Sequence, residues 1–437
     1  MRTTKPGQSS PHTKGATTPG TPPDSPTRRS GKPHESGGAL VGSGLALIAV
    51  TYGFARYAYG LFVPEFRTTF DLSETLLGVI GAGSYLGYCL AILLALVATA
   101  RVGARAMAIA AGLVAVVGMS IMATAPTAGV LAVGVLVAGS STGLASPPMG
   151  QAVAQRIPGH SQDRANAWIN AGTSLGVLVS APVAVLAAEQ WRPAWLLFAL
   201  FGGAVLLWNA RTMPGREHPG AEVSAPGTPA TRLSWRFLLN RDAVPLLVTA
   251  AGVGFASAAY WTFARDLVTQ VGQMSTTAGT GFWAVIGIAG LAGGLAGDTV
   301  RRLGLGGALA TSVLALALAT ALLAMAPAAI PLAYASAAIF GAAYILFSGI
   351  ILVWSVRVYS GRPAAGIGAG FLMIALGQSL GAPTAGYLAG ATSMPVAFVV
   401  FAGIAVLFLA FGPRRTAPSA EAPRRFLRRC WASRRRG

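Results

Sequence analysis

Long apolar blocks separated by short polar segments occupy most of the chain between residues 39 and 412. They do not alternate apolar with polar residues, as the strands of a membrane barrel would. A run of about 18 or more apolar residues with few charges is typical of a membrane-spanning helix, because about 20 residues at 1.5 Å each cross the hydrocarbon core. The pattern predicts twelve spans, at residues 39–64, 75–99, 104–124, 128–149, 165–188, 193–212, 243–264, 276–297, 305–326, 328–355, 363–389 and 394–412.

A polar segment at residues 213–242 divides the twelve blocks into two sets of six. Its first part, PGREHPGAEVSAPGTPA, is typical of a linker, and RLSWRFLLNRD after it is typical of an amphipathic helix on a membrane surface. Residues 1–37 are rich in Pro, Gly, Ser and Thr and are predicted to be disordered. We therefore expect six-helix bundles at 38–212 and 243–412, and a basic tail at 413–437.

Composition supports a membrane protein, since only 10% of the 437 residues are charged, whereas soluble domains carry about 25%. The net charge of +19 is concentrated at the chain ends, with six Lys and Arg residues in the N-terminal tail and nine Arg residues in the C-terminal tail. This placement favours attraction to anionic lipids, at about 1 kcal/mol per residue, over nucleic-acid binding. All four histidines lie in tails or loops, which argues against a metal site.

Arginines in the short loops predict the orientation of the spans. With the N-terminus inside, the outer loops carry only Arg67, Arg192 and Arg265. We therefore expect the tails and the linker to be cytoplasmic, at a plasma or inner membrane. The cytoplasmic loops then carry Arg101, Arg105, Arg156, Arg164, Arg301, Arg302, Arg357 and Arg362.

The two sets of blocks share a repeat with an offset of 201 residues. At this offset GFARYAYGLF (53–62) coincides with GFASAAYWTF (254–263) at six of ten positions. Because each set has an even number of spans, the two halves cross the membrane in the same direction, as parallel repeats do. The same offset aligns Glu65 with Asp266, Arg101 with Arg302, and Gly103 with Gly304.

The segment GGLAGDTVRRLG (293–304) resembles the inner-loop signature of the major facilitator superfamily, G-x-x-x-D-x-x-x-R-x-G. The matching positions are Gly294, Asp298, Arg302 and Gly304. In that family the acid and its arginines cross-link helix ends and help to hold the outward-facing state. The copy in the first half, ATARVGARA, keeps Arg101, Gly103 and Arg105 but lacks the acid.

Three further segments look like the YbfB/YjiJ branch of this superfamily: GFARYAYGLFVPEF, the pair WR at 191–192, and YWTFARDLV. The resemblance covers most of residues 40–410. It implies an all-α membrane protein in which two parallel bundles of six helices rock about a central site. It also implies that every third helix faces lipid, and the blocks at 305–326 and 394–412 indeed carry no ionisable residue.

Arg56 is the sharpest candidate binding residue, because it lies nine residues before Glu65 and therefore roughly 13 Å deeper along a helix. A charge at the bilayer centre costs about 2.5–3.5 kcal/mol and usually faces a cavity. Tyr52 and Tyr59 are predicted to share its helix face. Such an arginine either binds a carboxylate or phosphate in bidentate fashion, or pairs with a carbonyl as a structural residue.

Glu65 and Asp266 are equivalent acids at the predicted outer ends of two spans. They either carry protons and form an outer gate with Arg67 and Arg265, or anchor the helices as solvated ion pairs. Since no acid lies deep within a predicted span, proton coupling stays open. Further candidates for the cavity, which could instead hold helices together, are Ser257, Tyr260, Trp261, Tyr344, Asn170 and Gln378.

These patterns favour a secondary transporter of a small anionic or aromatic solute that works as a monomer without a cofactor. Two alternatives stay open. A membrane-embedded enzyme would show a cluster of histidines and acids, and none is visible in the sequence. A transporter-like sensor would bind a solute without moving it, and only a transport assay separates it from a transporter.

Overall fold

The structure is a computed structural model that describes residues 33–187, 190–215, 241–292, 296–360 and 363–413. The regular secondary structure of these residues is entirely helical. Most of the predicted tails and linker lies outside these residues. The first half contains α1 (Pro33–Ile48), the π-helix η1 (Ala49–Tyr57), α2 (Ala58–Leu61), α3 (Val63–Phe70), α4 (Glu74–Val102), α5 (Ala104–Ala123), α6 (Ala128–Arg156), α7 (Gly159–Leu186) and α8 (Trp191–Thr212). The second half contains α10 (Ala243–Asp266), η2 (Leu267–Val271), α11 (Thr276–Ala292), α12 (Ala296–Met325), α13 (Ile330–Val358), α14 (Pro363–Ala391), α15 (Met394–Leu407) and η4 (Phe408–Phe411).

Eleven helical segments among the described residues are long and apolar enough to cross a membrane. The remaining predicted span is α11, whose 17 described residues are apolar and end where residues 293–295 are left undescribed. The predicted helical fold class is confirmed. One boundary differs in a way that matters: the seventh span continues to Val271, so that Asp266 lies inside it rather than beyond residue 264.

The repeat found in the sequence reappears in the backbone. Gly103, between α4 and α5, has φ 89° and ψ 163°, and Gly304, inside α12, has φ 71° and ψ 169°. This conformation is essentially restricted to glycine. No other glycine in the described residues has a positive φ. The two positions are 201 residues apart and turn the chain at the same place in each half.

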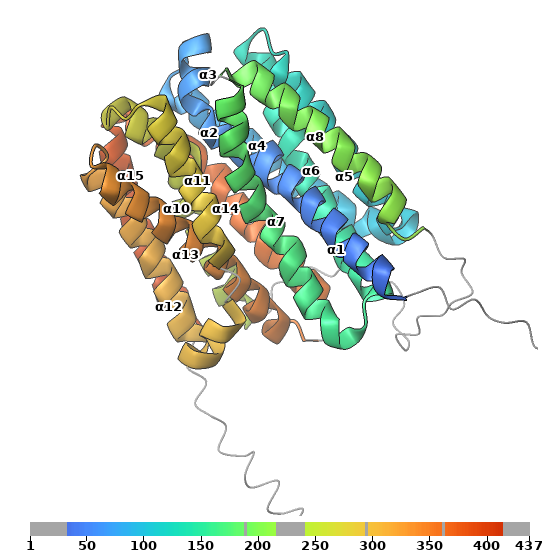
Figure 1. The fold of residues 1–437 in the computed structure, drawn as a ribbon. Coiled ribbons are helices and arrows are strands. Elements are labelled where there is room, and N and C mark those ends of the chain that lie inside the picture. The colour runs from blue at the N-terminus through green and yellow to red at the C-terminus, as the bar shows by residue number, and fades with distance from the viewer. Residues whose placement is uncertain (1–32, 188–189, 216–240, 293–295, 361–362, 414–437) are drawn as a thin grey trace, which may run out of the picture.

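Helices from the two halves pack along each other in two pairs, α4 with α14 and α7 with α11. Glycines make the close approach possible: a Cβ on Gly78 would lie 2.4 Å from the backbone oxygen of Ala382, and one on Gly287 would lie 2.4 Å from the backbone nitrogen of Leu178. In Figure 1 the two halves meet near α3 and diverge toward the opposite end of the molecule. We call the meeting region the α3 end.

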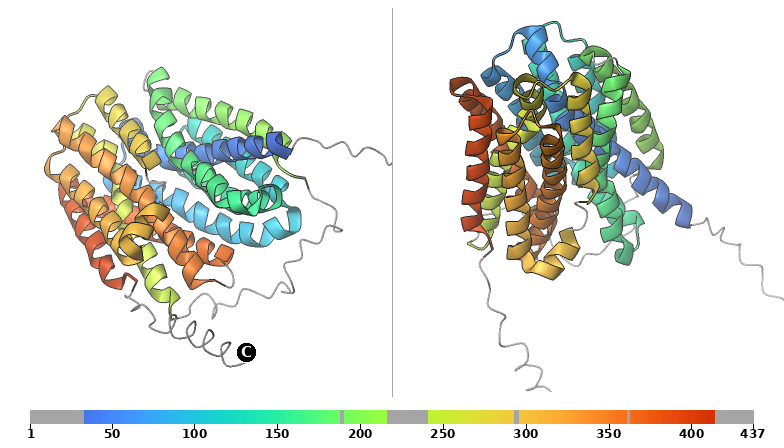
Figure 2. Two further views of the ribbon diagram at one scale, coloured as in Figure 1. Left: turned by 60° about the horizontal axis from the view of Figure 1, so that its bottom comes forward. Right: turned by 60° about the vertical axis from the view of Figure 1, so that its left-hand side comes forward.

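The start of α1 and the end of α15 both lie away from the α3 end (Figure 2). Helices α5, α8, α12 and α15 form the two outer flanks of the molecule, and their exposed side chains include Leu113, Leu200, Leu318 and Leu407. Helix α10 is the most enclosed span, with 72% of its apolar window buried. The arrangement places η1 and α10 at the centre, where the first and second halves face each other.

Candidate functional site

Arg56 is positioned by the π-helix η1, which interrupts the first span. The backbone N–H of Ala58 donates to the carbonyl of Gly53, five residues earlier, which is the bond pattern of a π-helix. Gly53 also lets this segment press against α7, since a Cβ there would lie 2.3 Å from Gly176 Cα. Such π-segments are rare and frequently occur at functional sites. Here the wider turn directs Arg56 into the interface, where its residue is only 5% exposed.

Four tyrosine rings surround the Arg56 guanidinium. Its Cζ lies 4.7 Å from the ring centre of Tyr88, 4.9 Å from Tyr85, 5.2 Å from Tyr57 and 5.8 Å from Tyr52. Each such contact is worth roughly 0.5–2 kcal/mol, with the higher values in sites removed from water. The rings therefore hold the charge in place without neutralising it.

Gln378 on α14 brings the second half of the molecule to Arg56. Arg56 Nη2 donates to Gln378 Oε1 at 2.6 Å, and Gln378 Nε2 donates to the Tyr344 hydroxyl at 3.1 Å and to Ser257 Oγ at 3.5 Å. Ser257, Tyr344 and Gln378 are the central residues of the spans 243–271, 330–358 and 365–391. The contacts of Arg56 thus lie at the midpoint of the second half. We call Arg56, its four tyrosines and Gln378 the Arg56 cluster.

The positive charge of Arg56 has no carboxylate partner in the ion pairs formed by the described residues. Its Nε is buried and has no hydrogen-bond partner among them. A buried donor left without a partner costs about 1–3 kcal/mol, and a buried charge is normally paired. The Arg56 cluster therefore holds a buried positive charge and one unpaired donor at the interface between the halves.

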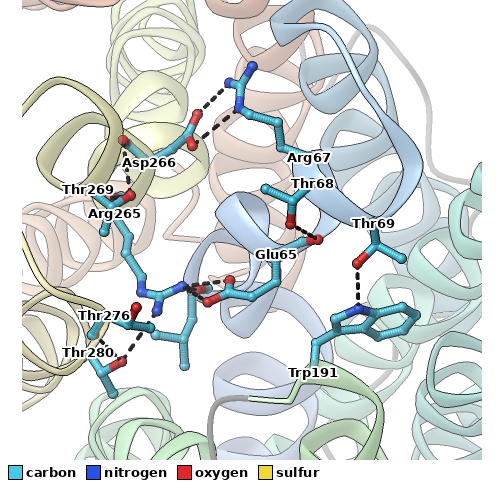
Figure 3. Close-up of polar contacts among 11 residues, drawn as sticks. Glu65, Arg67, Thr68, Thr69, Trp191, Arg265, Asp266, Thr269, Thr276 and Thr280 are labelled. Carbon is cyan, nitrogen blue, oxygen red and sulfur yellow. Dashed lines mark hydrogen bonds and ion pairs between the residues drawn. The ribbon is translucent and has the colours of Figure 1, made fainter. Parts of the chain in front are cut away.

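A second group of charges joins the halves at the α3 end, and we call it the ion-pair cluster (Figure 3). Arg265 Nη1 donates to both carboxylate oxygens of Glu65, at 2.6 and 2.7 Å. Arg67 Nη2 lies 2.5 Å from Asp266 Oδ2, and Arg67 Nη1 lies 2.8 Å from Glu74 Oε1. The first two pairs cross between α3 and α10.

The acids of the two crossing pairs, Glu65 and Asp266, are equivalent in the internal repeat, whereas the arginines are not, because Arg265 aligns with Pro64 and Arg67 with Val268. Asp266 is fully buried, at 0% exposure, and Arg265 also donates to the carbonyl of Leu61 and to Thr280 Oγ1. Such buried, multiply bonded pairs are costly to break by removing one partner, at about 3–5 kcal/mol. The ion-pair cluster closes the α3 end of the interface.

Comparison with known proteins shows the family. The sequence profile described as Major Facilitator Superfamily matches residues 45–371, which is most of the chain and includes both clusters except Gln378. The chain belongs to the Major Facilitator Superfamily. It is accordingly a multi-pass membrane protein with that superfamily's fold. Among curated protein sequences, none matches it.

Solved structures show the same fold at low sequence identity. The chain is similar to a variant of the nucleoside transporter NupG (TM-score 0.68, 16% identity, 85% of this chain and 98% of that chain covered). It is also similar to a POT family transporter in complex with 5-aminolevulinic acid (0.69, 13%, 87% and 97%), and to the human organic anion transporter MFSD10 (0.61, 18%, 87% and 100%). These likenesses show the superfamily fold; the YbfB/YjiJ branch stays a prediction.

Within this superfamily fold, several predicted binding residues gather at the interface. Tyr52 contacts Arg56, and its hydroxyl lies 2.8 Å from Ser146 Oγ. Trp261 stacks on Tyr57 across the two halves, with 4.0 Å between ring centres. Ser257, Tyr344 and Gln378 form the network already described. Together they form a group of polar and aromatic side chains packed between the two halves.

Other predicted binding residues lie elsewhere. The Tyr59 hydroxyl donates to the carbonyl of Leu77 on α4 at 2.7 Å. Tyr260 stacks on Phe340 within the second half, and its hydroxyl lies 2.8 Å from Ser336 Oγ. Asn170 is exposed on α7, where its side-chain amide donates to the carbonyl of Asn166. The described contacts of these three do not include the Arg56 cluster.

The signature residues Asp298, Arg302 and Gly304 lie at the end of the molecule opposite α3, and Gly294 lies outside the described residues. Asp298 pairs with Arg301 at 2.7 Å, and both side chains are exposed, at 53% and 77%. Arg101 and Arg302 are exposed as well, and Arg105 Nη2 donates to the carbonyl of Ala210 in the last turn of α8. The Asp298–Arg301 pair lies within the second half and the Arg105–Ala210 contact within the first, in contrast to the ion-pair cluster.

Reasoning from the sequence missed Tyr57, Tyr85, Tyr88 and Glu74. Tyr85 and Tyr88 lie three residues apart in GSYLGYCL, a spacing that puts both rings on one face of α4. This pair could have been recognised in the sequence, because two phenols one turn apart in the middle of an apolar span are expected to face other helices rather than lipid. Tyr57 gave no signal, since a regular helix would turn it away from Arg56.

Proposed function

We propose that this superfamily member is a secondary active transporter that moves a small anionic solute, with or without an aromatic part, by alternating access. The observation that carries the proposal is the Arg56 guanidinium, buried between the two halves and lacking an acidic partner among the described residues. Transporters of this fold bind their substrates near the bilayer midplane, between the two repeats. The Arg56 cluster has that location and donors from both halves.

Charge and shape together favour an anion over a cation. The cluster contributes one guanidinium and several hydroxyl and amide groups, and its aromatic rings are already in contact with Arg56. A cation would meet like-charge repulsion here, whereas an anion would gain charge-assisted hydrogen bonds in a site of low dielectric. The three similar structures carry names with different substrates, so the fold itself does not choose among them.

The two clusters suggest how access would alternate. We infer that the loop arginines place the α3 end outside and both termini in the cytoplasm. The described conformation then has its outer end closed by Glu65–Arg265 and Arg67–Asp266. For the site to open outward, these pairs have to separate. Asp266 gives the interface a buried carboxylate that could take a proton when Arg67 leaves, which is how we propose that protons couple to transport.

Counterflow in proteoliposomes tests the proposal. An anion that stabilises the purified protein should exchange across the membrane of liposomes loaded with the same anion, and Arg56→Gln should abolish that exchange. Arg211→Gln is the matched control, because Arg211 is exposed in the last turn of α8 and belongs to neither cluster. Binding without exchange in the wild type would identify a sensor instead. Unchanged exchange in Arg56→Gln would remove the Arg56 cluster from the transport site.

A further inference from the structure

We propose that the Arg56 cluster recognises a carboxylate, and that the ligand replaces Gln378 as the partner of Arg56. This inference rests on the proposed transport function and deepens it, because it names the ligand class and the contact that binding breaks. It starts from the way the Arg56 side chain is used. Arg56 Nη2 donates to the side-chain oxygen of Gln378, whereas Arg56 Nε has no hydrogen-bond partner among the described residues.

Nε and Nη2 of an arginine lie on the same edge of the planar guanidinium and bind the two oxygens of a carboxylate side by side. In the Arg56 cluster, Nη2 donates to Gln378 Oε1 at 2.6 Å, while Nε is buried without a partner in the described residues. Gln378 therefore fills half of a bidentate site. A carboxylate would put one oxygen where Gln378 Oε1 lies and would satisfy Nε with the other.

The rings around Arg56 select a planar anion. Four tyrosine rings lie over Arg56 Cζ at 4.7–5.8 Å, so the charge is surrounded by π-systems whose faces are negative. A planar carboxylate brings two oxygens to the Nε–Nη2 edge and has no third oxygen to place against those faces. A tetrahedral phosphate or phosphonate would direct an anionic oxygen toward them. The cluster thus favours carboxylates over tetrahedral anions.

The exchange has a structural consequence, because Arg56 and Gln378 come from different halves. Gln378 is fully buried and keeps its amide nitrogen on Tyr344 and Ser257 of its own half. When a carboxylate takes Arg56, the direct hydrogen bond between the halves at this point is lost. Ligand binding would then release one of the contacts that hold the two halves together, and Gln378 would act as a positioning residue for that step.

Acetate and acetamide test the exchange in the purified full-length protein. Gln378→Ala removes the competing oxygen and leaves a space of acetamide size beside Arg56. We expect acetate to stabilise this variant thermally, with an apparent affinity at least tenfold higher than for the wild type. Acetamide and methylphosphonate should stabilise it less than acetate. Adding Arg56→Gln to Gln378→Ala should abolish the effect of acetate.

The inference is overturned if acetate binds the wild type as tightly as Gln378→Ala, or if acetamide stabilises that variant as well as acetate does. It is also overturned if acetate stabilises neither protein. Should Gln378→Ala fold poorly, Gln378→Glu gives the second test. Its own carboxylate should pair with Arg56, raise the midpoint of thermal unfolding and prevent stabilisation by added carboxylates.

These outcomes separate this inference from the function on which it rests. If larger anions stabilise the wild type through Arg56 while Gln378→Ala weakens their binding, Gln378 is an ordinary substrate ligand and the proposed transport site survives. If no anion depends on Arg56, the transport site itself is wrong.

Discussion

Arg56 and Asp266 are both buried charges, but their surroundings stabilise them in different ways. Asp266 is fully enclosed and lies 2.5 Å from an arginine of the other half, so its charge is matched within the protein. Arg56 is nearly as enclosed but is held by aromatic rings and one amide oxygen. A matched pair stabilises one conformation, whereas an unmatched donor favours a ligand. On this contrast rests our proposal that Asp266 helps to close the molecule and that Arg56 binds a ligand.

Replacing Asp266 with asparagine tests the closing role. Asp266→Asn keeps the shape but removes the charge opposite Arg67, whose remaining acidic partner among the described residues is Glu74. We expect the free energy of unfolding to fall by about 1–3 kcal/mol, because a buried charge-assisted bond becomes a weaker one. The midpoint of thermal unfolding in detergent measures it.

Asp298→Asn is the control for this substitution, since Asp298 and Arg301 form an exposed pair and exposed pairs contribute little. Equal shifts in the two variants would show that the ion-pair cluster does not stabilise the closed α3 end.

Among the helices, unusual backbone geometry occurs beside the Arg56 cluster and at the two equivalent turns of the repeat. The π-helix η1 directs Arg56 into the interface, and Gly103 and Gly304 turn the chain at equivalent points of the two halves. The conformation of both glycines costs other residues of order 1–3 kcal/mol. Their agreement in position and in backbone angles makes the repeat a property of the structure as well as of the sequence.

Gly304→Ala should lower the free energy of unfolding by about 1–3 kcal/mol through the backbone alone, since no atom lies within 4 Å of the added Cβ. Gly203→Ala is the matched control: its Cβ also meets open space, but it lies within α8. There alanine should be neutral or stabilise by up to about 1 kcal/mol. Thermal unfolding of the two variants side by side checks the difference, and a harmless Gly304→Ala would contradict the assigned backbone.

The membrane-spanning helices could be predicted because a hydrophobic run long enough to cross a bilayer seldom forms any other structure. The helical fold class could be predicted from these runs. Side-chain directions could be predicted only where the helix is regular. Tyr59 was expected beside Arg56 at regular spacing, but in the structure it contacts Leu77, while Tyr57 takes the position at Arg56. The partner Gln378 lies 322 residues away. No local pattern reveals which of several polar residues in α14 meets Arg56.

The whole molecule consists of two parallel halves that touch closely at the α3 end and diverge beyond it (Figure 1). Glycine contacts between α4 and α14 and between α7 and α11 permit that approach. The Arg56 cluster lies between the halves, and the ion-pair cluster lies at the α3 end. With the Arg56 cluster as the proposed binding site, this order of a closed end, a site and a divergent end is what alternating access requires of one of its states.

The orientation proposed for this arrangement predicts a labelling pattern. Thr392, between α14 and α15, and Ser360, after α13, are both exposed but belong to opposite ends of the molecule. In a variant without Cys89 and Cys430, a membrane-impermeant maleimide added to intact cells should label Thr392→Cys and spare Ser360→Cys. Labelling of Ser360→Cys alone would invert the orientation, and with it the side on which the described conformation is closed.

The central claim is that Arg56 anchors an anionic solute between the two halves, and thermal stabilisation of the purified protein tests it most directly. A panel of carboxylates, phosphates, cations and neutral aromatic compounds would be compared on the wild type, Arg56→Gln and the control Arg211→Gln. A ligand at about 100 times its dissociation constant adds about 2.7 kcal/mol of stability. The account predicts that anions stabilise the wild type and Arg211→Gln but not Arg56→Gln. Stabilisation of all three proteins by cations or neutral compounds, with no response to anions, would contradict it.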